Sequence, residues 1–210
     1  MQARIQEEHH LILPSSEMRQ APQEVASPLL VSERLILRSP EAADIDAIAH
    51  LANNINVASK VSRMPYPYTV TDARNFVDRV ASGAMGKCVY AITRIDTREL
   101  IGCCGLQAQE SDSALEIGYW LGEPFWNRGY ATEAAQTLID FGFRNFGIDF
   151  IDGRVRVMNT ASRRVLQKCG FQFQGTGMAT SLALGGMVPV EWFRLDRKTW
   201  SSLRNWGGAR

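Results

Sequence analysis

One stretch of the chain constrains the fold more than any other: a strand-like run, a glycine loop and a long helix in direct succession. The run "EIGYWL" (116–121) is followed by "NRGYA" (127–131) and then by an amphipathic helix over 131–147. A helix N-terminus offers unpaired N–H groups and partial positive charge, and Gly129 permits a backbone φ that other residues resist. The loop therefore predicts a site for phosphate or pyrophosphate. An ordinary strand-to-helix turn with Thr132 as N-cap is the alternative.

The rest of the chain alternates strand and helix patterns. Residue alternation and β-formers predict strands over 34–40, 88–95, 99–107, 114–121, 151–159, 171–175 and 188–196. Helical spacing predicts helices over 41–53, 71–82, 131–147 and 160–170, and either a helix or a frayed end after residue 196. We expect Thr71 or Asp72 to cap the second helix and Gly170 to end the fourth. The order indicates an α/β (α+β) domain with a mixed central sheet of six to seven strands and helices on both faces.

The ends of the chain differ from its centre. Three prolines, Pro14, Pro22 and Pro28, stand among polar residues without periodicity, so residues 1–28 are predicted to be a flexible tail. The domain is expected over 29–200, followed by a C-terminal end over 201–210.

Composition excludes several classes of function. The net charge of +1 indicates neither nucleic-acid nor membrane binding, and no apolar run reaches the roughly 18 residues of a bilayer span. The three histidines are too few for a histidine-rich metal site or a Ser-His-Asp enzyme. The four cysteines form no C-x-x-C pair, which favours reduced thiols in a cytoplasmic protein without a metal.

Three motifs in order resemble one known family. They are "SERLILRSP" (32–40), "GYWL" followed by W-x-x-G-x-A-T-E-A from Trp126, and N-x-x-S-x-x-x-x-x-K-x-G-F from Asn159. Together they are similar to the GNAT family, the GCN5-related N-acetyltransferases, and within it to the RimJ/RimL-like branch. The resemblance spans residues 30 to about 200. Trp126 stands where the wider family often has Gln or Arg, as is usual in this branch.

The resemblance implies acetyl-CoA as co-substrate and no metal. It places the pyrophosphate on the backbone N–H groups of 128–132, with Arg128 adding charge, and the pantetheine arm between the splayed parallel strands 116–121 and 154–158. Asn159 is expected to bond a pantetheine amide, to cap the next helix, or both. The expected cofactor-binding residues are Tyr119, Trp120, Leu121, Asn127, Arg128, Gly129, Tyr130, Ala131, Thr132, Asn159 and Ser162.

The implied chemistry is attack of a neutral amine on a thioester, which needs a base and a donor for the leaving thiolate. Glu116, the carboxylate of the "ALEIGYWL" strand, is the expected general base, directly or through water; its alternative is a surface residue. By resemblance Ser162 is the expected donor, with Tyr130 a weaker candidate, and Ser162 could instead serve the first turn of its helix. A strand N–H near Tyr119 or Trp120 would polarise the carbonyl.

The acceptor is expected to be a primary amine, either a protein N-terminus or a small molecule, which attacks directly in a ternary complex. Its site is predicted under 62–69 with Trp120 and Trp126 close by, and Glu191 could face it and attract a cationic acceptor. Three points stay open: acyl relay through Cys103 or Cys104, a homodimer, and a non-catalytic acyl-CoA-binding or regulatory module on the same scaffold.

Overall fold

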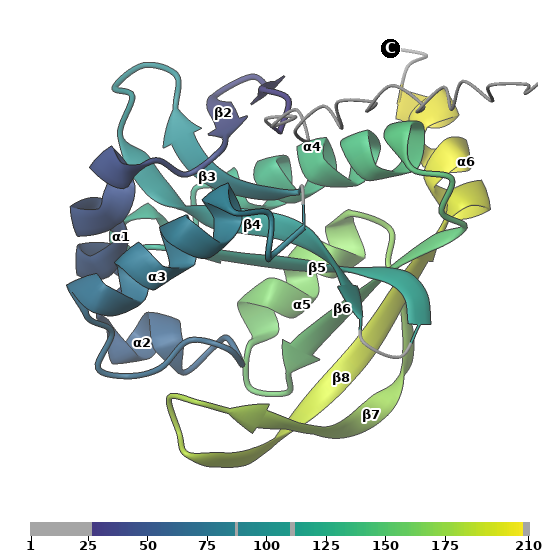
Figure 1. Cartoon of the computed structure of the whole chain (residues 1–210). Coiled ribbons are helices and arrows are strands. Elements are labelled where there is room, and N and C mark those ends of the chain that lie inside the picture. Colours follow the sequence, from purple (N-terminus) through teal and green to yellow (C-terminus); the bar gives the residue numbers. More distant parts are fainter. Residues whose placement is uncertain (1–26, 87, 110–111, 208–210) are drawn as a thin grey trace, which may run out of the picture.

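A computed structural model describes residues 27–86, 88–109 and 112–207, which contain an eight-stranded sheet in the order β1-β2-β3-β4-β5-β6-β8-β7 (Figure 1). The strands are β1 (Leu30–Val31), β2 (Leu35–Arg38), β3 (Val89–Arg94), β4 (Leu100–Gln109), β5 (Asp112–Leu121), β6 (Phe150–Arg156), β7 (Gln172–Ser181) and β8 (Gly186–Asp196). Neighbours pair antiparallel except β5 and β6, the one parallel pair among the described strands.

Helices cover both faces of the sheet. They are α1 (Ile45–Ala52), α2 (Ile55–Ala58), α3 (Val70–Ala81), α4 (Tyr130–Asn145), α5 (Thr160–Lys168) and α6 (Arg197–Gly207), with short 3-10 turns at Ala42–Asp44 and Glu123–Phe125. Two adjacent cysteines of β4 divide the core, because successive strand residues point to opposite faces. Cys103 belongs to a buried cluster with residues of α1–α3, and Cys104 belongs to a buried cluster with residues of α4 and α5. The predicted two-sided domain is confirmed.

The parallel pair β5–β6 opens partway along its length. Its ladder joins Leu115 to Ile151 and ends at Ile117 and Gly153, although β5 continues to Leu121. Beyond that point the two strands separate, as the sequence resemblance implied. The gap lies beside the N-termini of α4 and α5, which follow β5 and β6 in the chain.

The structure corrects several details of the sequence prediction. The described residues form eight strands rather than six to seven, because β1 adds a two-residue edge. Helix α2 was not predicted, since its four residues are too few to show periodicity. The strand expected over 171–175 is the ten-residue β7, an edge strand whose largely exposed residues give no clear apolar alternation.

The caps and ends need further corrections. Thr69, not Thr71 or Asp72, caps α3, because Thr69 Oγ1 accepts from Asp72 N while the Asp72 carboxylate accepts from Thr69 N. Gly170 follows α5 with φ +91°, as predicted for the residue after a helix. Of the two alternatives for the residues after 196, a helix or a frayed end, the structure shows the helix, α6. Residues 1–26 of the expected tail and 208–210 lie outside the described residues.

Candidate functional site

The N-terminus of α4 has the uncapped form that the sequence predicted. Gly129 is the N-cap with φ +81°, and no side chain caps the helix. The helix begins with the bond from Glu133 N to Gly129 O (3.1 Å), so the N–H groups of residues 130–132 precede its first hydrogen bond. Asn127 also has positive φ, +60°. Thr132 is therefore not the cap, and the backbone N–H groups stay available to a ligand.

Arg34 supports this loop from behind, a role that sequence reasoning missed. Its guanidinium donates to the Arg128 carbonyl (3.0 Å), lies 4.7 Å from the centre of the Tyr130 ring and pairs with Glu133 at 2.7 Å. Glu133 also accepts from Ser32 Oγ and Arg34 N. Burial alone would raise the pKa of Glu133, but these hydrogen bonds outweigh it and hold that pKa below its ordinary value. The signal was present in "SERL", which sequence analysis used only as a family motif.

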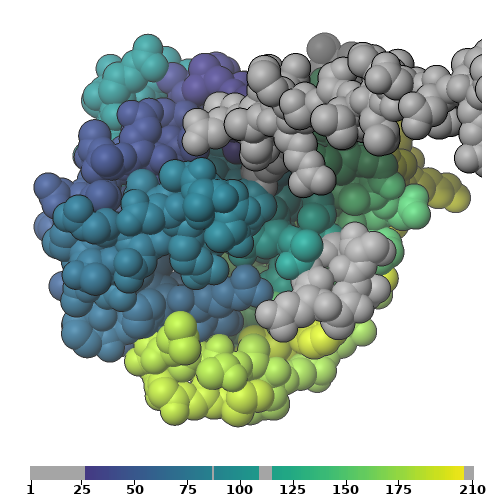
Figure 2. All heavy atoms as spheres, in the orientation of Figure 1, coloured from purple at the N-terminus to yellow at the C-terminus, as the bar shows by residue number. Residues whose placement is uncertain are grey.

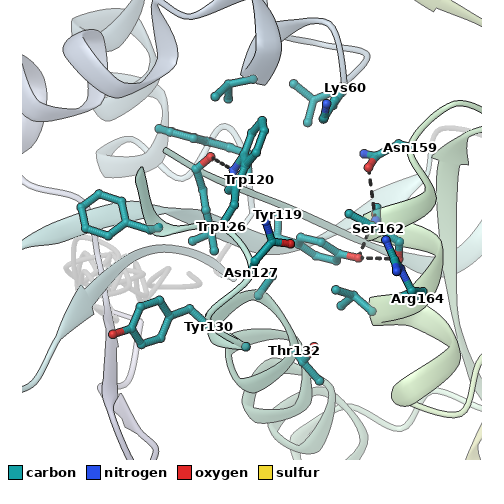
Figure 3. Close-up of a pocket in the computed structure, with 18 of the residues that line it drawn as sticks. Lys60, Tyr119, Trp120, Trp126, Asn127, Tyr130, Thr132, Asn159, Ser162 and Arg164 are labelled. Carbon is teal, nitrogen blue, oxygen red and sulfur yellow. Dashed lines mark hydrogen bonds between the residues drawn. The ribbon is translucent and has the colours of Figure 1, made fainter. Parts of the chain in front are cut away.

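A cavity of about 340 Å³ opens at the N-terminus of α4 and is called the α4 cavity (Figure 3). Ten of the eleven expected cofactor-binding residues line it: Tyr119, Trp120, Leu121, Asn127, Gly129, Tyr130, Ala131, Thr132, Asn159 and Ser162. Arg128 is the exception, since it does not line the cavity. Its backbone carbonyl accepts a hydrogen bond from Arg34. Lys60, Arg164 and Lys168 also line the cavity, and no carboxylate does. Sequence reasoning gave none of these three cations a binding role, although Lys168 is the lysine of the motif that begins at Asn159. Arg164 and Lys168 both lie on α5, whereas Lys60 follows α2.

The open end of β5 directs backbone groups into the gap. Gly122 N donates to Ile101 O (2.9 Å), so residue 122 is paired toward β4. In an antiparallel ladder this pairing alternates, which turns the N–H and C=O of Tyr119 and Leu121 away from β4, toward β6. The Leu121 carbonyl accepts from Trp126 Nε1 (2.8 Å). Of the two expected carbonyl-polarising positions, the alternation favours Tyr119 over Trp120.

Ser162 links Asn159 and Tyr119 in a small hydrogen-bond chain in the α4 cavity (Figure 3). Its hydroxyl and the Tyr119 hydroxyl share a bond of 2.9 Å, and its N–H donates to Asn159 Oδ1 at 3.2 Å. Asn159 is thus the N-cap of α5, which confirms the capping role expected for it. Burial raises the pKa of the Tyr119 phenol well above its usual value, and the bond to Ser162 offsets this only in part. Both hydroxyls therefore carry protons at neutral pH.

Tyr130 and Trp126 are placed differently from their expected roles. The Tyr130 hydroxyl points away from Ser162 in Figure 3, and its ring is buried against Arg34. This orientation does not favour Tyr130 as the thiolate donor. Trp126, expected near the acceptor, lines the α4 cavity, where the Lys60 ammonium lies 4.9 Å from the centre of its ring.

A second cavity of about 700 Å³, the α3 cavity, is also lined by Tyr119 and Trp120. Its walls include residues 62–65, one side of α3, the middle of β4 and β5, and the end of β7. The bond from Leu182 N to Ser62 O (3.0 Å) joins the β7–β8 turn to the 62–65 segment, and Figure 2 shows that yellow-green hairpin beside the blue segment. The two cavities share Val61, Tyr119 and Trp120.

Glu116 lines the α3 cavity, whereas Ser162 lines the α4 cavity. Arg154 of β6 donates from Nε and Nη2 to Glu116 Oε2 (2.9 and 2.5 Å), and no hydrogen bond within the described part of the chain reaches Oε1. Glu191 lines neither cavity, because it pairs with Arg163 of α5 at 2.6 Å. The expected attraction of a cationic acceptor by Glu191 is therefore not supported.

The remaining candidate groups are unsuited to chemistry. Cys103 and Cys104 are both buried, and burial raises the pKa of each thiol. A raised pKa leaves almost no thiolate at neutral pH, which opposes the acyl-relay alternative. Among residues 27–86, 88–109 and 112–207, no cluster of three potential metal ligands and no membrane-spanning helix is found.

Comparison with known proteins identifies the family of this chain. A family model described as "Acetyltransferase (GNAT) domain" matches residues 34–172. The uncharacterized N-acetyltransferase p20 of Bacillus licheniformis is 30% identical over 82% of this chain and 98% of its own. A GNAT-family acetyltransferase from Bacillus anthracis superposes with a TM-score of 0.72 at 23% identity, covering 81% of this chain and 99% of that one. RimJ of Mycobacterium smegmatis, solved with a CoA-disulfide, gives 0.68 at 20% identity, covering 87% and 94%. Since the family match covers well over half of the sequence, this chain belongs to the GNAT acetyltransferase family.

Proposed function

We propose that the protein transfers the acetyl group of acetyl-CoA to a primary amine by direct attack in a ternary complex. One observation carries this proposal: two cavities with complementary chemistry share a wall at Tyr119 and Trp120 of β5. The α4 cavity offers backbone N–H groups, cations and two hydroxyls. The α3 cavity offers a carboxylate and apolar walls.

The α4 cavity suits coenzyme A. Its pyrophosphate would lie on the N–H groups of residues 129–132, where helix polarity favours an anion. Lys60, Arg164 and Lys168 add positive charge for phosphate groups without any competing carboxylate in the lining. The pantetheine arm would pair with the outward backbone groups of Tyr119 and Leu121, like an added strand.

The thioester would then lie where the two cavities meet. The Tyr119 N–H faces the gap and would donate to the carbonyl oxygen as negative charge develops there. The amine nitrogen forms the C–N bond, and the C–S bond breaks. Ser162 Oγ, which Tyr119 OH contacts at 2.9 Å and orients, would donate a hydrogen bond to the departing thiolate, which then takes its proton from water.

The amine's surplus proton needs an acceptor on the opposite side. Glu116 is the candidate, because it lines the α3 cavity on the same strand as Tyr119. Arg154 fixes the carboxylate through Oε2, which leaves Oε1 to take the proton directly or through one water. The base for the amine and the hydrogen-bond donor for the thiolate therefore belong to different cavities.

The test separates catalysis from binding. The protein is mixed with acetyl-CoA and pooled amines, including peptide N-termini, amino acids and polyamines, and free thiol is titrated while calorimetry measures coenzyme binding. Thiol release that depends on an amine supports the proposal. Coenzyme binding without thiol release for every amine class would instead favour the non-catalytic acyl-CoA-binding module.

A further inference from the structure

The charged lining of the α3 cavity is unbalanced. Among the described residues, five charged side chains line it: Arg63, Asp72, Arg79, Glu116 and Arg154. Three are cations and two are carboxylates, so the cavity carries an excess of positive charge although the whole chain is close to neutral. A positively lined cavity concentrates anionic ligands.

Both carboxylates are already engaged. Asp72 accepts from the N–H and hydroxyl of Thr69 (2.8 and 2.6 Å) in the α3 capping box, and Glu116 accepts from Arg154. Arg63 and Arg79 therefore have no carboxylate partner among the described residues. Their guanidinium groups remain available to a ligand.

Arg63 and Arg79 both line the α3 cavity, where the acceptor amine is proposed to bind. Arg63 Nη1 donates to Gln107 Oε1 (3.0 Å), and Gln107 is the register partner of Glu116 across β4 and β5. Arg63 is thus anchored beside the strand pair that carries the proposed base. Arg79 lines the cavity from α3, on the helical stripe that it shares with Asp72 and Phe76.

We propose that the acceptor is a small amine that also carries a carboxylate on an apolar body. This inference rests on the proposed function and names its substrate class. Arg63 and Arg79 bind the carboxylate, because guanidinium matches its geometry with paired N–H donors. Met64, Tyr68, Phe76, Met85 and Leu182 provide apolar walls. The volume of about 700 Å³ falls within the range of roughly 300–1,000 Å³ that is typical of small-molecule sites.

The wild-type protein tests the charge preference directly. Acceptors are supplied in matched pairs, each carboxylate against its neutral carboxamide: para-(aminoethyl)benzoate and a series of ω-aminoalkanoates of increasing length. Thiol release gives kcat/KM for each. We expect the best carboxylate to exceed its carboxamide by about tenfold, and the advantage to shrink at high salt because both arginines are exposed.

Substitution of Arg63 and Arg79 then tests whether these two residues cause the preference for carboxylates. In Arg63→Gln and Arg79→Gln, KM for the carboxylate should rise about three- to tenfold while KM for the carboxamide stays constant. Arg74→Gln is the matched control, because Arg74 is an exposed arginine of α3 that does not line the cavity. Three outcomes would overturn the inference. They are equal activity within every pair, a preference for carboxamides or for acidic peptides, and a carboxylate preference that is unchanged in both variants. Absence of thiol release with every amine would instead overturn the proposed function itself.

Discussion

The α4 cavity and the α3 cavity lie on either side of one strand segment, yet they are built in different ways. The α4 cavity uses backbone N–H groups, a left-handed glycine and a gap between two strands. The α3 cavity is lined by residues from loops, two helices and five strands. A site built from backbone groups keeps its ligand when side chains are substituted, and it suits a constant group such as a phosphate. A site built from side chains can bind a different ligand after a few residue substitutions. The proposed function therefore gives the α4 cavity the coenzyme and the α3 cavity the choice of amine.

The largest expected effect comes from the proposed base in the α3 cavity. Glu116→Gln should lower kcat by about 10²–10³-fold, because a positioned acid–base group contributes on that order, and coenzyme affinity should not change. Steady-state thiol release and calorimetry measure the two quantities separately.

The chain supplies a close control for that variant. Asp152 pairs with Arg194 on the neighbouring strand and has the same 19% side-chain exposure as Glu116. It lines neither cavity, so Asp152→Asn should leave kcat within about twofold. Equal losses in both variants would mean that the carboxylates serve the sheet and not the reaction.

A smaller effect is expected on the other side of the thioester. Ser162→Ala should lower kcat by about 10–100-fold, and Tyr119→Phe by less, because Tyr119 acts by orienting the Ser162 hydroxyl. The loss should be smaller with a thioester whose thiol has a low pKa, since such a leaving group needs less protonation. Tyr90→Phe is the control, because the buried Tyr90 hydroxyl has no hydrogen-bond partner among the described residues.

The difference between the cavities also explains what the sequence could predict. Ten of the eleven expected cofactor residues line the α4 cavity, since most of them fall in two contiguous motifs around 119–132 and 159–162. Local rules on glycine, helix N-termini and capping apply to such stretches directly. Arg34 was missed because its partners, Arg128 and Glu133, are distant in sequence and meet it only in the folded chain.

The α3 cavity could be predicted only in outline. The segment 62–69 was correctly expected to border it, but Arg79 was not identified, and Glu191 was expected there although it faces α5. The face that Glu191 occupies follows from its pairing with Val155 and from Arg163, neither of which is a local signal. The fold could be predicted more fully than the α3 cavity, because the apolar periodicity of β3–β6 and α4 is strong. The extent of β7 was missed, because β7 is a largely exposed edge strand.

The backbone origin of the α4 cavity leads to a prediction of intermediate size. Gly129→Ala places a Cβ at φ +81° and 3.3 Å from Arg34 Nη2. The left-handed conformation costs a non-glycine residue about 1–2 kcal/mol, so the loop should shift and coenzyme affinity should fall by about tenfold. Calorimetry with CoA measures the change.

Gly147→Ala is its control, because Gly147 has open space around it and no positive φ. That variant should bind CoA normally. Unchanged affinity in Gly129→Ala would show that the coenzyme is held by side chains, and the contrast between the two cavities would fail.

The smallest effect concerns the support behind the α4 loop and depends on pH. Glu133 has a lowered pKa in the folded protein, so its stabilisation is present above the unfolded glutamate pKa of about 4.3 and is lost as pH falls through the lower folded value. Glu133→Gln should therefore lower the free energy of unfolding by about 1 kcal/mol at pH 7, with the difference from wild type vanishing in strong acid. Urea titrations across that range measure it. A constant difference at every pH would attribute the effect to packing, whereas a difference that vanishes in acid would show that the ionised Glu133 carboxylate, with its hydrogen bonds from Ser32 and Arg34, stabilises the fold.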